Sequence, residues 1–400
     1  MPLGWIDFSK TERNKVLSVL DLLSEQGTLD ELGIAPVRDG FSELFFPGTT
    51  TIQTRAKYFF IVPYALKDME QSKTTTVGKM VKEFDDLEQA CGKRFLENNP
   101  NEIGIIGSRS LSNGGWVKRT PADVYWAGLR KYGIFLNGSL SLSEYLRAIC
   151  ALKADKDNLL KLGNRNDASR DEFSSDDKDA GTISGIRFWD IPTYHQDWFQ
   201  DLRMELTSEE GAFLKQKMIS HYPDSMLSYV LTHEVQGFFD GNSFQDMKSI
   251  IHLFPEQIQV DYQLAYEVSD FLDAINTQYN LILSNGENEE AVRKWAVIST
   301  ELKQIASVDL DAVFQRLQLQ NHRLYRFLKE AQDAMLANDV DRLQKEIRRR
   351  ERELKTTRAK TLHPGEFDTS NWYGVGVMDY RFSYAKVILN DIKESEEPSC

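Results

Sequence analysis

Apolar residues recur at helical spacing in several parts of this 400-residue chain, and these parts predict most of its secondary structure. Near the start, Ser9 and Glu12 have the spacing of a capping box, so a helix is expected over about 10–26. Thr207 and Glu210 repeat this spacing before another helical region. The clearest stripe consists of Leu264, Val268, Phe271, Leu272, Ile275, Tyr279 and Ile282. The second half of the chain is therefore expected to be mostly helical.

The first part of the chain has a mixed pattern. The apolar run Tyr58–Val62 fits a buried strand or the middle of a buried helix, because so short a run has no decisive period. Ile103–Gly107 and Trp116–Arg119, joined across Asn113-Gly-Gly, predict a β-hairpin. A helix opened by Pro121 follows. The sequence thus predicts an α+β fold, mainly α with a smaller β component, and a winged-helix-like element by analogy.

A polar segment separates the two patterns. Residues 164–182 are charged and lack both periodicity and apolar anchors, which is typical of a linker or an exposed loop. We therefore expect a mixed α/β domain over 1–163, a linker or loop over 164–182, and a mostly helical, acidic domain over 183–400.

Charge is distributed unevenly along the chain. The net charge is −13, yet residues 1–150 hold 18 basic and 18 acidic residues, so the remainder carries the whole deficit. Within the neutral part, the stretches 44–67 and 103–143 are locally basic. The overall negative charge argues against a general nucleic-acid-coating protein. The uneven distribution still allows a basic surface in the first 150 residues and an acidic remainder of the chain.

Aromatic residues accompany these cations, and the combination predicts a nucleic-acid-binding surface. Cations neutralise phosphates, while aromatic rings stack on bases. The expected phosphate contacts are Arg55, Lys57, Lys118, Arg119, Arg130 and Lys131, and the expected stacking residues are Trp116 and Trp126. In the alternative interpretation, the tryptophans belong to the core and the charges only solvate its rim. The sequence leaves both interpretations open.

A second basic segment lies near the C-terminus. Residues 339–360 hold nine basic and five acidic residues, and they predict a long helix. Pairs at i,i+4 such as Glu346 and Arg350 stabilise an exposed helix without any partner. The functional alternative is phosphate contact by Arg348, Arg349, Arg352 and Arg358.

Metal and cofactor sites find no support in the sequence. His233-Glu234 begins like the zinc-binding pattern H-E-x-x-H, but Gly237 stands where the second histidine is required. A glycine-rich phosphate loop with the lysine of a nucleotide site is also missing from the sequence. We therefore expect no metal and no cofactor.

One spacing suggests a catalytic alternative. Arg358 with His363, and also Arg316 with His322, match the R-x4–6-H spacing of helical, metal-independent ribonucleases. In that chemistry the arginine stabilises phosphate charge and the histidine transfers a proton. Chance matches of so short a pattern are common, so we expect no catalytic residue and keep Arg358 and His363 as the alternative.

Several short segments together match one family pattern. In the first part of the chain they are Trp5–Ser9, Asp30–Ile34, Phe46–Phe59, Gly104–Gly107 and Pro121–Leu129, and nearer the end they include Arg352–Lys355 and Asp379–Arg381. They resemble an uncharacterised bacterial family of unknown function that opens with a W-[IL]-D-F-S motif. The resemblance carries no catalytic assignment. It implies a role near DNA modification and phage defence, since members are encoded among such genes.

These observations lead to one expected function and two alternatives. We expect a non-catalytic nucleic-acid-binding accessory component of a bacterial DNA-processing or defence system, with DNA or RNA and a protein from the same system as partners. The alternatives are a metal-independent ribonuclease and a scaffold that binds a partner enzyme through its acidic helical half. The longest apolar run, Tyr58–Leu66, is far shorter than the roughly 20 residues that span a bilayer, and no secretion signal is recognised. A cytoplasmic protein without membrane contact is therefore expected.

Overall fold

The computed structural model describes residues 30–98, 100–166, 186–192, 194–195, 197–200, 202–368 and 370–396, with the backbone alone for 156–166. The motif at residues 5–9, the helix expected over about 10–26 and most of the segment 164–182 lie outside the described residues. Across the part that is described, no helix is long and apolar enough to cross a membrane.

Helices make up the regular structure of the described residues, and these residues form no sheet. A single isolated antiparallel bridge joins Phe135 and Trp189. The predicted α+β fold, with its smaller β component and its winged-helix-like element, is therefore wrong. The expectation of a mostly helical second half is confirmed.

The predicted hairpin is replaced by turns and a short helix, α5 (Ser108–Ser112). Gly104 and Gly107 adopt φ values of +94° and +80°, which interrupt an extended strand. The loop is held by side chains instead of a strand partner: the Thr54 hydroxyl donates to the Gly104 carbonyl at 2.6 Å, and the Ile106 amide donates to the Tyr58 hydroxyl at 2.9 Å. Asn113 therefore ends a helix rather than beginning a hairpin turn.

The apolar run that fitted either a strand or a helix belongs to a helix, α3 (Tyr58–Gln71). Every residue from Tyr58 to Leu66 is buried. A helix that is apolar on all sides must be enclosed by other elements. Because such a helix has no polar face, its sequence lacks the regularly spaced polar residues from which the helical period is recognised.

The described chain groups into two compact units, each built from two stretches of sequence. Unit 1 comprises residues 1–42 and 247–380, and unit 2 comprises residues 43–246 and 381–400. The chain passes from unit 1 to unit 2 within the helix α2 (Ala35–Phe45). It returns to unit 1 within the helix η1 (Phe244–Ser249). The boundary predicted at 164–182 lies mostly outside the described residues and stays a prediction.

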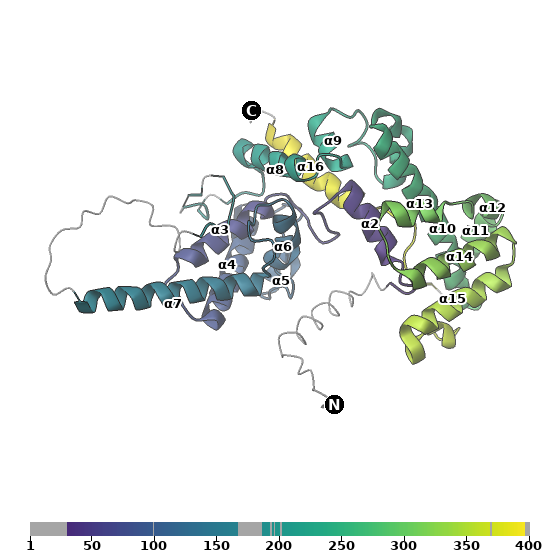
Figure 1. The fold of residues 1–400 in the computed structure, drawn as a ribbon, viewed down its shortest axis with the longest axis horizontal. Coiled ribbons are helices and arrows are strands. Elements are labelled where there is room, and N and C mark those ends of the chain that lie inside the picture. Colours follow the sequence, from purple (N-terminus) through teal and green to yellow (C-terminus); the bar gives the residue numbers. More distant parts are fainter. Residues whose placement is uncertain are drawn as a thin grey trace, which may run out of the picture. The chain divides into compact units, whose positions relative to one another are not determined.

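In unit 2, α3 packs against α4 and α6, and the C-terminal helix α16 packs along α8 (Figure 1). Aromatic residues fill the space between α3 and α6, where the rings of Phe59 and Tyr125 meet edge to face at 5.0 Å. Besides α3 and α5, the helices are α4 (Val77–Asn98), α6 (Pro121–Lys131), α7 (Leu142–Asn166), α8 (Ser208–His221), α9 (Met226–Thr232) and α16 (Phe382–Glu396).

In unit 1, the long helix α10 (Glu256–Leu283) forms the centre, and α14 (His322–Leu336) packs against α15 (Val340–Lys355) (Figure 1). The helical stripe predicted over Leu264–Ile282 is confirmed by α10. The other elements are η2 (Ile251–Leu253), α11 (Glu289–Ile298), α12 (Leu302–Ile305), α13 (Leu310–Arg316), η3 (Thr356–Arg358) and η4 (Lys360–Leu362).

Candidate functional site

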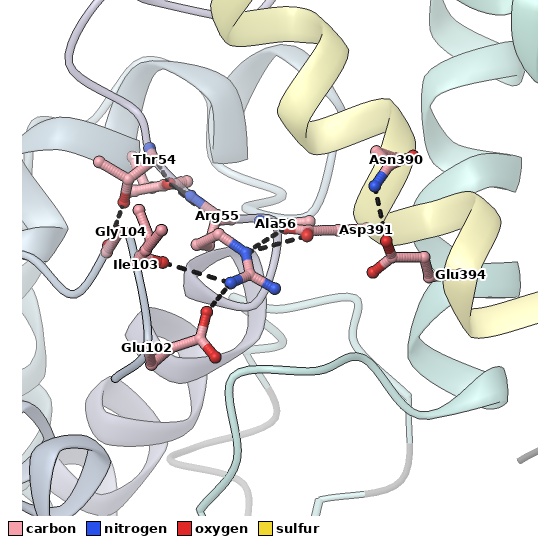
Figure 2. A network of polar contacts seen from close by, with 10 residues as sticks. Thr54, Arg55, Ala56, Glu102, Ile103, Gly104, Asn390, Asp391 and Glu394 are labelled. Atoms are coloured by element: carbon pink, nitrogen blue, oxygen red, sulfur yellow. Dashed lines mark hydrogen bonds and ion pairs between the residues drawn. The ribbon is translucent and has the colours of Figure 1, made fainter. Parts of the chain in front are cut away.

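Arg55, the first predicted phosphate contact, lies in a polar network within unit 2 (Figure 2). Its Nε donates to both carboxylate oxygens of Asp391, at 2.9 and 3.1 Å, and its Nη1 donates to Glu102. One of the Asp391 oxygens also accepts from the backbone amide of Ala56 at 2.7 Å. The Arg55 side chain is only 15% exposed, so two carboxylates already neutralise this cation.

The backbone around Arg55 is held as firmly as its side chain. The hydroxyl of Tyr125 accepts from the amides of Thr54 and Arg55 and donates to the Arg55 carbonyl, all within 3.0 Å. Burial lowers the pKa of the Arg55 guanidinium, but Asp391 and Glu102 outweigh this effect and raise it above its ordinary value. The network therefore fixes a permanent charge in one orientation.

Lys57 and Lys131 are also engaged by carboxylates. The Lys57 Nζ donates to Glu210 at 2.7 Å, and both side chains are buried. Glu210 in turn accepts from the amide of Thr207 and completes the capping box of α8. Lys131, at the end of α6, forms an ion pair with Glu43. A phosphate that contacted Lys57 would have to displace a buried carboxylate, which is costly.

The two tryptophans differ in exposure. Trp126 is buried at 8% exposure, and its Nε1 donates to the Leu140 carbonyl at 3.2 Å. Trp116 is half-buried, and its Nε1 donates to Asp85 at 3.0 Å. Trp126 thus has the core position of the alternative interpretation, whereas part of the Trp116 ring faces solvent.

The remaining predicted contacts lie nearer the surface. Lys118 and Arg130 are exposed, and Arg119 is half-buried. Burial raises the pKa of Asp123, and the nearby charge of Arg119 opposes this rise. Of the predicted cations, Arg55, Lys57 and Lys131 pair with carboxylates; of the two tryptophans, Trp126 is enclosed, and Trp116 donates to Asp85 but keeps part of its ring exposed. Nucleic-acid contact by these residues stays a prediction, and the freest candidates among them are Lys118, Arg130 and Trp116.

The second basic segment, α15, begins and packs for local reasons. Asp339 caps its first turn, since the Asp339 side chain accepts from the Arg342 amide at 2.9 Å. Leu343 and Ile347 are fully buried one turn apart and hold the helix on unit 1. The face of α15 opposite Leu343 and Ile347 is therefore exposed to solvent.

Several α15 cations are occupied by structural contacts. The Nε of Arg350 donates to the Leu32 carbonyl at 2.8 Å, and Lys355 pairs with Glu31. Arg349 pairs with Glu330 and with Glu346. These side chains therefore stabilise the fold of unit 1 and are poorly placed to take up a phosphate.

Three other cations form a stripe on the outer face of α15: Lys345, Arg348 and Arg352. Their spacing of i, i+3 and i+7 places them on one side of the helix. No carboxylate in the described residues pairs with any of the three. Arg348 donates to the Thr361 carbonyl at 3.3 Å, and burial lowers its pKa without an acidic group to offset it. We call these three residues the α15 stripe.

The α15 stripe lines a groove with a volume of about 650 Å³. The other described lining residues, Asp341, Gln344, Arg349 and Glu353, come from the same helix. The described lining thus holds four basic and two acidic side chains, and this excess of cations attracts an anionic ligand; arginine in particular matches the geometry of phosphate oxygens. The phosphate-contacting alternative suggested for this segment therefore has a geometric basis at Arg348 and Arg352.

The catalytic alternative receives no such convergence. Arg358 and His363 are both exposed, and the His363 Nδ1 lies 3.5 Å from Glu366. Arg316 makes a bidentate ion pair with Asp261, at 2.6 and 2.8 Å, which occupies it structurally. As for metals, no group of three or more His, Cys, Asp or Glu within the described residues could hold an ion.

The carboxylate partners explain what the sequence pattern missed. Asp391 is 336 residues from Arg55, and Glu210 is 153 residues from Lys57. No local spacing signals either pair, because each forms only when distant helices pack. A local signal did exist for the α15 stripe, since nine cations within 22 residues exceed the five carboxylates available in the segment.

Comparison with known proteins adds one finding. Neither a search of curated proteins nor a search of solved structures gives a match. The family model that matches covers residues 1–180, which include α3 to α7 but not α15 or α16. Residues 1–180 of this chain thus match a family of unknown function, DUF6361.

Proposed function

We propose that this protein is a non-catalytic nucleic-acid-binding accessory component of a bacterial DNA-processing or defence system, and that α15 is its phosphate-contacting element. The observation that carries the proposal is the α15 stripe: Lys345, Arg348 and Arg352 line a groove, and none of the three pairs with a carboxylate among the described residues. The resemblance to a family encoded among DNA-modification and phage-defence genes favours nucleic acid over other polyanions.

The charge of the whole chain shapes the expected affinity. With a net charge of −13, long-range attraction to a polyanion is weak, so binding depends on local contacts. Three phosphate contacts give a slope of about −2.7 for log K against log salt on duplex DNA. We expect weak, salt-sensitive binding with little preference for base sequence, because phosphate contacts carry no sequence information.

The test is the salt slope of a double variant, Lys345→Ala with Arg352→Ala. It removes two phosphate contacts, so the slope should shrink by about 1.8 and affinity at low salt should fall for every duplex sequence. Fluorescence anisotropy with a labelled DNA duplex measures both quantities. The matched control is Arg293→Ala with Lys303→Ala, which removes two exposed cations of α11 and α12 in the same unit and should leave the slope unchanged.

Two results would contradict the proposal. Equal slopes for the stripe variant and the control variant would show that total charge, rather than the stripe, controls binding. Cleavage of RNA without divalent ions, abolished by His363→Ala, would replace the non-catalytic function with the ribonuclease alternative.

A further inference from the structure

A cavity of about 750 Å³ lies beside the Arg55 network within unit 2. Its walls are the loop 53–55, the loop 101–104, Phe239 and the outer face of α16 from Tyr384 to Glu394. Figure 2 shows the Arg55 side chain between the loop that carries Glu102 and the α16 residues Asn390, Asp391 and Glu394. This volume is in the range of small-molecule sites.

Arg55 presents a preorganised donor at the edge of this cavity. Its Nε and Nη1 are held by Asp391, Glu102 and the Ile103 carbonyl, so the guanidinium plane is fixed. Its Nη2 has no hydrogen-bond partner in the described residues. The two N–H bonds of Nη2 can therefore bind a ligand acceptor without breaking the network.

The charges around the cavity favour an uncharged acceptor. Arg55 is already neutralised by Asp391 and Glu102. Lys386 donates to the carbonyls of Phe239 and Gly241, at 3.3 and 2.6 Å, and the exposed carboxylate of Glu394 adds another negative charge. The formal charges of the described lining residues sum to −1, and Lys393 over the Phe239 ring brings the total to zero, so a phosphate or carboxylate would find no net positive charge to offset its loss of hydration. A carbonyl oxygen or a ring nitrogen meets no such penalty.

The other walls suggest a flat ring with N–H donors. The ring of Tyr384 and the side chain of Val387 are 41% and 40% exposed, and the half-buried Phe239 lies among the lining residues. The Lys393 Nζ lies 4.9 Å from the centroid of the Phe239 ring and covers one of its faces, so Tyr384 is the ring placed to stack on a nucleobase. One oxygen of Glu394 accepts from the side-chain amide of Asn390 at 2.6 Å, and the other, which has no hydrogen-bond partner among the described residues, can accept from a ligand N–H.

We propose that this cavity binds an uncharged purine with a ring carbonyl, free or as a nucleoside, for which guanosine is the probe. Guanine offers adjacent O6 and N7 acceptors of the kind that arginine N–H groups recognise. Its N1–H and exocyclic amine supply donors for the Glu394 carboxylate. The site is separate from α15 and does not depend on the nucleic-acid function proposed for that helix.

The experiment is isothermal titration of the full-length protein with guanosine, cytidine and inorganic phosphate. Guanosine should bind and phosphate should not compete with it. Tyr384→Ala removes the exposed ring on which the purine would stack and should weaken guanosine binding at least about tenfold. Val297→Ala, which truncates an apolar residue that is 67% exposed in unit 1, is the control and should bind like the wild type.

A second variant guards against misfolding of the first. Glu394→Gln leaves the Arg55 network intact and removes the charged acceptor, so guanosine binding should weaken about tenfold without a change in the melting temperature. Absence of guanosine binding to the wild type, competition by phosphate, or undiminished binding in both Tyr384→Ala and Glu394→Gln would overturn the proposal.

Discussion

At the scale of single residues, burial imposes a protonation state on Glu88 of α4. One of its oxygens accepts from the Ala122 amide at 2.7 Å, and the other, Oε2, has no hydrogen-bond partner among the described residues. Burial raises the pKa of Glu88 to about 8; contacts with the Ala122 amide and the Thr120 side chain oppose this rise, and the charges of Asp123 and Asp85 add to it. The carboxyl group is therefore neutral in the folded protein at pH 7 and ionised in the unfolded chain.

This difference predicts how the stability depends on pH. Between about pH 4.5 and pH 8 the unfolded chain loses a proton that the folded protein keeps, so the free energy of unfolding falls as pH rises. The slope from one such group is at most about 1.4 kcal/mol per pH unit. Glu88→Gln should flatten the profile in this window, as measured by urea denaturation at several pH values.

The control for this prediction lies on the same helix. The side chain of Glu97 is 65% exposed, so Glu97→Gln should keep the wild-type slope. A Glu88→Gln protein with an unchanged slope would show that the buried carboxyl is not the group that titrates.

At the scale of elements, α10 does more than supply an apolar stripe. The Asn280 side chain accepts from the Tyr373 amide at 2.8 Å and donates to the Tyr373 carbonyl at 2.9 Å. Asn276 and Asn280 follow Ser269 by seven and eleven residues, so these three polar side chains share one face of α10. The Ser269 hydroxyl accepts from the Met378 amide at 2.9 Å. This face therefore binds the irregular segment 373–378 by its backbone.

Asn280→Ala tests the importance of this contact. The substitution leaves the Tyr373 amide without its acceptor and leaves the Tyr373 carbonyl with only the longer bond from Asn276, at 3.3 Å, so the free energy of unfolding should fall by about 1–3 kcal/mol. Ser284→Ala is the control, because the Ser284 hydroxyl donates only to carbonyls of its own helix and should be nearly neutral. Equal effects of the two substitutions in urea denaturation would mean that segment 373–378 is held by other contacts.

At the scale of the whole molecule, neither compact unit is a continuous stretch of sequence. Unit 2 includes α16, whose Asp391 binds Arg55 and whose apolar residues pack on α8. A helix from the last 20 residues of the chain therefore completes a core that begins near residue 43.

The fragment 1–163 tests this organisation against the division expected from composition. It lacks α8 and α16, so Arg55 and the Ala56 amide lose Asp391, and Lys57 loses Glu210. We expect no cooperative thermal transition by circular dichroism, whereas the full-length protein should melt cooperatively. A cooperative transition of the fragment would instead support a domain boundary at 164–182.

The sequence alone determined those features that depend on neighbours a few residues apart. The capping box at Thr207 and Glu210, the α10 stripe and the cation-rich α15 were all predicted, because helical hydrogen bonds and caps join residues about four apart. Only the tertiary structure decided the rest. The run at Tyr58–Val62 has no polar face, so its helical form depends on the surrounding helices. Whether Arg55 and Lys57 meet phosphate or carboxylate depended on Asp391 and Glu210, which packing brings from distant positions into contact.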